Sequence, residues 1–175
     1  MPTMRRIARS PITWVLSAIV VVAVGIGLVL FQPWRLFTDT VVNEAAPTVA
    51  TTAGAAPREE PRTLSRGEFV SHEHGTSGSA AVVRLPDGSR VLRLENLDTS
   101  DGPDLRVWLT DAPVLEGRAG WFVFDDGRYE DLGNLEGNKG SQNYVIPPEV
   151  DLSALTSVSI WCERFHVSFG AAQLR

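Results

Sequence analysis

The sequence is poor in the side chains that most often carry catalysis or bind metals. It has one cysteine and three histidines in 175 residues. A single cysteine excludes a disulfide within the chain, and no pair of Cys or His residues has the short spacing of a closed structural zinc site. Gly-x-Ser-x-Gly, His-Glu-x-x-His and a phosphate-binding glycine loop are also missing, so hydrolase and nucleotide-binding functions have no support.

Basic residues are outnumbered in the C-terminal part of the chain. Residues 64–175 contain ten Arg and Lys and seventeen Asp and Glu, a net charge of −7. A protein that binds nucleic acid needs a basic face to neutralise phosphates, so no nucleic-acid partner is expected. The acidic surface instead favours a basic or cationic partner.

Charge is entirely absent from one N-terminal run, Ile12 to Phe31, which reads ITWVLSAIVVVAVGIGLVLF. Twenty apolar residues in a helix cover the roughly 30 Å hydrocarbon core of a bilayer. Three arginines precede the run and one follows it closely (Arg5, Arg6, Arg9 and Arg35). The excess predicts a cytoplasmic N-terminus over 1–11, a single transmembrane helix over 12–31 and a C-terminal part outside the cell membrane.

A cleaved signal peptide is the alternative to a membrane anchor. Its apolar region usually spans about 7 to 15 residues and ends at a small-residue cleavage site. Here Gln32-Pro33-Trp34-Arg35 follows instead, and Trp14 and Trp34 stand near the two expected interfaces. Interfacial tryptophans are typical of an uncleaved span.

The segment 32–63 is predicted to be a disordered extracytoplasmic linker. Residues 38–62 are rich in Ala, Thr and Pro and contain no aromatic residue, so they bury too little apolar surface to order themselves. A flexible coil of this length would hold the following domain about 25 to 30 Å from the membrane.

Residues 64–175 show short alternating apolar runs separated by Gly, Asp, Asn and Pro, with no sustained helical period. We expect an all-β domain, an antiparallel β-sandwich or flattened barrel, because so many short strands in one open sheet would expose edges and a face. The expected strands are 66–71, 79–85, 90–95, 105–109, 121–124, 142–146, 157–162 and 165–169, with one helical turn over 151–155.

The only cysteine lies in IWCERFHVSFG, residues 160–170. Apolar residues change parity within this stretch, which predicts a turn or bulge near Glu163-Arg164. One interpretation is that Cys162 packs as a small hydrophobe. The other interpretation is a redox or ligating thiol. An unpaired cysteine outside the membrane is either buried, disulfide-bonded to another chain or functional. Arg164 and His166 nearby would favour its thiolate, which is the reactive form.

Histidines supply the remaining candidates for a metal or haem site. His72 and His74 are two residues apart, so in an extended backbone they would face the same side. Together with Cys162 and His166 they are candidate ligands for copper, zinc or haem iron. An absence of any cofactor is equally compatible with the sequence.

Several separated motifs agree in order and spacing with one known family. They are Gly67-x-Phe69, His74 and Gly78, Gly102-Pro103-Asp104-Leu105, Leu132-Gly133-x-Leu135-x-Gly137, Tyr144-x-Ile146-Pro147, Val158-x-Ile160-Trp161-Cys162 and Phe165-x-Val167-x-Phe169-Gly170-x-Ala172-x-Leu174. Over 64–175 the chain resembles the DM-thirteen domain, called an electron-transfer domain, and looks like a bacterial-type, single-pass anchored member. In animals the domain accompanies DOMON domains in cell-surface and cuticle proteins.

The resemblance implies a function and a site. The family's hallmark cysteine falls on Cys162, which is proposed to act as a naked thiol or to hold a prosthetic group such as haem. His74 matches a recurrent family histidine, whereas His72 and His166 look particular to this chain. The implied function is membrane-anchored electron transfer or thiol redox with another protein as redox partner. The rival function is a binding or adhesion module in which Cys162 only packs.

Overall fold

A computed structural model describes residues 10–47 and 60–175, which form two compact units, one ending at Trp34 and one beginning at Arg35. The first unit contains the helix α2, Pro11–Phe31. Pro11 opens the helix, where its missing N–H costs nothing, and Gln32 closes it in the left-handed region with its N–H bonded to Leu28 O. None of its residues is buried, and α2 is long and apolar enough to cross a membrane or to serve as a signal sequence.

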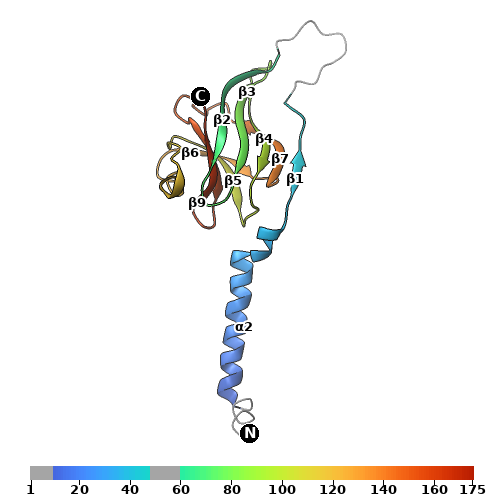
Figure 1. Cartoon of the computed structure of the whole chain (residues 1–175), viewed down its shortest axis with the longest axis vertical. Helices are drawn as coiled ribbons and strands as arrows, with labels where there is room; N and C mark the ends of the chain where they lie inside the picture. The colour runs from blue at the N-terminus through green and yellow to red at the C-terminus, as the bar shows by residue number, and fades with distance from the viewer. Residues whose placement is uncertain (1–9, 48–59) are drawn as a thin grey trace. The chain divides into compact units, whose positions relative to one another are not determined.

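The second unit is a nine-stranded sheet in the order β1-β7-β4-β3-β2-β9-β8-β5-β6, drawn in Figure 1. Every neighbouring pair is antiparallel except β1 and β7, so the sheet is mixed. The strands are β1 Val41–Asn43, β2 Arg62–Ser71, β3 Ser77–Arg84, β4 Arg90–Asp98, β5 Leu105–Thr110, β6 Tyr129–Asn134, β7 Lys139–Ile146, β8 Ser157–Cys162 and β9 Val167–Gln173, with short 3-10 helices at η1 Pro33–Phe37 and η2 Gly117–Gly120.

The connection between β6 and β7 requires the sheet to curl. These strands are separated by seven strand spacings in the sheet order, about 34 Å in a flat sheet at about 4.8 Å each. Yet only residues 135–138 join them, and five extended steps reach at most about 18 Å. The sheet therefore bends round into a half-barrel, which confirms the all-β class and the barrel alternative.

The expected strands of 64–175 are confirmed with shifted ends, apart from two differences within this range. Residues 121–124 are not a strand but part of the long β5–β6 connection, in which Phe124 is buried. The strand β6 was not expected, because YEDLGN offers almost no apolar alternation. The predicted helical turn at Asp151 is present, since Leu155 N donates to Asp151 O.

Part of the segment 32–63 differs from the expected disordered linker. Residues 33–37 form η1, Val41–Asn43 form the edge strand β1, and β2 begins at Arg62. Asn138, which is buried, holds this segment: its Oδ1 accepts from Thr40 N at 2.7 Å and its Nδ2 donates to Asp39 at 2.9 Å. Residues 48–59 lie outside the described part. The sheet unit begins at Arg35 and therefore includes residues 35–47.

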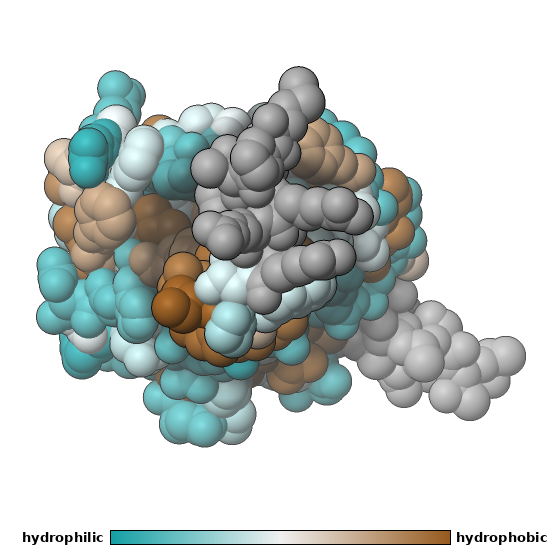
Figure 2. Space-filling view, turned by 90° about the horizontal axis from the view of Figure 1, so that it is seen from below, coloured by the Kyte–Doolittle hydropathy of each residue, from teal (hydrophilic) through white to brown (hydrophobic). Residues whose placement is uncertain are grey.

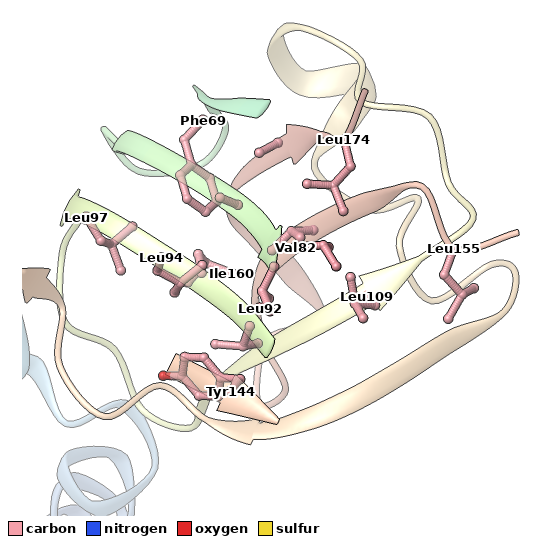
Figure 3. Close-up of a cluster of buried hydrophobic side chains, with 14 of the residues drawn as sticks. Phe69, Val82, Leu92, Leu94, Leu97, Leu109, Tyr144, Leu155, Ile160 and Leu174 are labelled. Atoms are coloured by element: carbon pink, nitrogen blue, oxygen red, sulfur yellow. The ribbon is translucent and has the colours of Figure 1, made fainter. Parts of the chain in front are cut away.

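The concave side of the sheet holds the main core, shown in Figure 3. Alternate residues of seven strands point into it, as the period of two requires. Its fully buried members include Val82, Leu92, Leu94, Val107, Leu109, Val158, Ile160 and Cys162. Figure 2 shows many teal, hydrophilic residues on the surface, with brown, hydrophobic residues among them.

A second, smaller cluster covers the convex side of β5, β8 and β9. It comprises Trp108, Ala112, Phe124, Trp161 and Ala171. Residues 111–128, between β5 and β6, supply Ala112 and Phe124 to it. Both faces of β8 are consequently buried, with Cys162 on one side and Trp161 on the other.

Candidate redox site

Cys162 ends β8 and points into the main core with no exposed surface. It pairs with Leu105 in β5 and with Val167 in β9. Its Sγ lies 3.4 Å from Pro103 O, to which the thiol donates its hydrogen. The expected turn follows at once, since Phe165 N donates to Cys162 O and His166 takes a positive φ of 50°.

The surroundings of the thiol oppose its ionisation. Burial raises the pKa of the Cys162 thiol above its ordinary value, and the negative charges of Asp104 and Glu73 act in the same direction. Backbone N–H groups of Phe165 and Arg164 lower it by less. This corrects the expectation that Arg164 and His166 favour the thiolate: the thiol is protonated at neutral pH and unsuited to nucleophilic exchange.

His166 lies on the surface and not against Cys162. Its side chain is 67% exposed, and its Nδ1 is 3.3 Å from Asp125 Oδ2. Its ring stands edge-on to Trp161 with centroids 6.4 Å apart. The turn at 163–166 causes this, because it sends the histidine toward the convex side of the sheet, where Trp161 lies.

His74 occupies a different position, over the ring of Phe169 at a centroid distance of 4.0 Å. Its Nε2 pairs with Glu73 Oε2 at 2.5 Å. The imidazole is thus tied to a carboxylate and an aromatic ring. Phe169 belongs to the same main core as Cys162.

His72 is a buried structural histidine. Its Nε2 is 3.0 Å from Leu115 O, which can only accept, so Nε2 carries the hydrogen and Nδ1 accepts from Ser168 Oγ at 2.8 Å. Ser159 Oγ in turn donates to Ser168 Oγ at 3.0 Å. The chain of bonds ties the β5–β6 connection to β9, and burial lowers the pKa of His72, keeping it neutral.

The predicted ligands do not assemble into a metal-ion site. Within residues 10–47 and 60–175, no three His, Cys, Asp or Glu side chains form a group that could hold a metal ion. The Cys162 thiol donates a hydrogen bond to the Pro103 carbonyl. Both ring nitrogens of His72 form hydrogen bonds, with Ser168 and with Leu115. The donor set therefore does not fit a metal centred on Cys162.

The structure reveals an aromatic stack that the sequence reasoning missed. Tyr129 lies parallel to Trp108 with centroids 3.9 Å apart and planes at 7°, and Trp108 stacks on Trp161 at 5.0 Å and 23°. Tyr129 lies on β6, which is not among the strands that the sequence predicts. No spacing in the sequence signals the contact, since it joins three different strands.

The comparison with protein families adds the decisive observation. The family model described as Electron transfer DM13 matches residues 68–174, well over half of the chain. The chain belongs to the electron transfer DM13 family. No curated protein and no solved structure matches it. The matched region covers the last four residues of β2 and all of β3 to β9, including Cys162. Membership assigns the DM13 domain a general redox role.

Proposed function

We propose that this DM13 domain transfers single electrons outside a membrane in which α2 anchors the chain, with the Cys162 thiol as its redox group. The observation that carries the proposal is the complete burial of the only thiol. Thiol–disulfide exchange and metal ligation require direct access to sulfur. Electron transfer does not, because an electron crosses a layer of packed side chains that no reagent enters.

The proposed step balances with one external partner, a protein that accepts one electron. Cys162 loses an electron to this oxidant, its S–H bond, which is directed at Pro103 O, breaks, and the proton is released to solvent. The resulting thiyl radical returns to the thiol when a donor supplies an electron and the proton comes back. No bound metal or haem takes part in this step.

Anchoring at the membrane is supported by the length of α2, its lack of buried residues and the arginines that precede it. The sheet unit begins at Arg35, four residues after α2 ends. We infer that α2 tethers the domain to the membrane and that its redox partner works on the same side of the membrane.

A second candidate function is favoured by the same burial. A binding or adhesion module needs Cys162 only as a small core residue, and a protonated, sealed thiol meets that need. The two functions differ in what happens when electrons are withdrawn from the protein.

The test is oxidation of the full chain, in detergent micelles, by hexachloroiridate(IV), a one-electron oxidant. Free thiol is counted after quenching and unfolding. We expect thiol to be lost as oxidant is consumed in the native wild type and in Ile160→Val, a core control that costs about 0.5–1.5 kcal/mol. Cys162→Ser is expected to stay folded and to consume less oxidant. Oxidant consumption with the thiol intact would favour the binding module.

A further inference from the structure

We propose that Tyr129, Trp108 and Trp161 form a conducting route by which an electron leaves the buried part of the domain for an oxidant docked at Tyr129. The three rings come from adjacent strands, β6, β5 and β8, and their contacts are continuous. The proposal rests on the proposed function in one respect only: the group that reduces the oxidised Trp161 at the end of the route would be Cys162.

The stack leads from solvent to the interior. Tyr129 is 46% exposed, Trp108 is 3% exposed and Trp161 is fully buried. Trp161 is joined by one peptide bond to Cys162, which lies on the opposite face of the same strand. An oxidant at the surface thus touches one end of the stack, while the other end adjoins the sole thiol.

The chemistry of the rings suits single-electron transfer. After thiolate, phenol and indole are the side chains that lose an electron most readily. A positive charge on Trp108 would lie between the faces of Tyr129 and Trp161, and aromatic faces attract cations. This attraction offsets part of the cost of a charge in a low-dielectric interior.

The buried indole N–H groups favour movement of the electron alone. Those of Trp108 and Trp161 have no hydrogen-bond acceptor among the residues that the structure describes. An oxidised indole without an acceptor keeps its proton, so the charge passes from ring to ring without proton transfer. Buried polar groups normally have partners, and the exceptions call for an explanation.

The step balances as follows. The oxidant gains one electron from Tyr129. Trp108 then donates an electron to Tyr129, and Trp161 donates an electron to Trp108. The products are the reduced oxidant and a Trp161 radical cation. If Tyr129 releases its phenol proton to water when it is oxidised, it takes a proton back from water when Trp108 reduces it. No bond to carbon or sulfur changes along the stack.

The surface around Tyr129 indicates the charge of the oxidant. An open groove of about 460 Å³ borders it, and the charged residues lining this groove are Glu130, Glu149 and Asp151 with one arginine, Arg128. The net negative charge favours a cationic oxidant, such as a basic redox protein.

The test uses the full chain in detergent with a ruthenium polypyridyl photo-oxidant attached at Glu149→Cys, which lines the same groove. Cys162 is sealed and escapes labelling, and Trp14→Phe with Trp34→Phe removes two exposed competitors. Flash–quench oxidation is expected to produce the visible absorption of a tryptophanyl radical. Trp121→Phe, a tryptophan outside the stack, should leave this signal unchanged.

Two variants decide the outcome. Trp108→Phe keeps an aromatic ring in the stack but should abolish the tryptophanyl signal, and Tyr129→Phe, at an exposed position, should delay it without affecting the fold. A signal unchanged in both variants overturns the route. Cys162→Ser separates this result from the proposed function: a longer-lived radical supports both, whereas an unchanged lifetime leaves the route standing and removes the thiol from the electron path.

Discussion

Trp161 and Cys162 are consecutive residues that face opposite sides of β8, and each is completely buried. The indole belongs to the convex cluster with Trp108, and the thiol belongs to the main core. One strand thus places two oxidisable groups in separate dry compartments. Solvent reaches neither, so their chemistry must be tested by withdrawing electrons and not by adding reagents alone.

We expect Cys162 to resist thiol reagents in the native chain. Its sulfur is sealed and burial raises its pKa, so little thiolate exists at neutral pH. Labelling by a disulfide reagent at pH 7 to 8 should be slow until denaturant unfolds the domain. The exposed control Ser153→Cys, in a Cys162→Ser background, should react at once. Rapid labelling of native wild type would contradict the sealed position.

The same raised pKa predicts a loss of stability in alkali. The unfolded thiol ionises near its ordinary pKa of 9.0, whereas the folded thiol ionises only at higher pH. The contribution of Cys162 to the free energy of unfolding is therefore constant below pH 9 and decreases as the pH rises above 9. Urea unfolding of wild type and Cys162→Ala across this range measures the effect. The variant should lack this component of the pH dependence.

His72 predicts a loss of stability in acid. Its folded pKa is lowered by burial, so the unfolded state binds more protons below its ordinary value of 6.5, and stability present above that pH falls as the pH drops. His72→Gln should show a shallower decline of the free energy of unfolding between pH 7 and 5 than wild type.

Phe124 and Phe122 provide a matched pair in the β5–β6 connection. Phe124 is fully buried against Trp161, whereas Phe122 is 47% exposed. Phe124→Ala should cost about 3–5 kcal/mol in the free energy of unfolding, and Phe122→Ala far less. Denaturant unfolding measures both values. Equal effects would show that the convex cluster does not hold this connection.

Asn138 and Asn134 provide a second pair. Buried Asn138 bonds Asp39, Thr40 and the carbonyl of Thr99, and exposed Asn134 is the control. Asn138→Ala removes the partner of Thr40 N and of the Thr99 carbonyl, whereas Asp39 keeps its ion pair with Lys139, and the loss should cost about 1–3 kcal/mol. Hydrogen exchange should quicken in β1, and Asn134→Ala should leave it unchanged.

Local pattern predicted most of the fold. Alternation in VLRLEN and SVSIWC indicated strands, and the apolar run of α2 predicted a long helix, because both signals lie within a few neighbouring residues. β1 and β6 escaped prediction since each is defined by its partner strand and not by its own apolar period. The predicted site combined Cys162 with His166, but the structure places His166 on the surface beside Asp125.

Composition and order along the chain alone determined the apolar helix, the all-β class, the single thiol and the acid excess. Those properties need no knowledge of distant residues. The tertiary structure decided that Cys162 is sealed and protonated, that His166 turns outward to Asp125, and that Tyr129 meets Trp108. The reason is physical: burial, pKa and ring stacking are set by side chains from separate strands, and only the closing of the curled sheet brings them together.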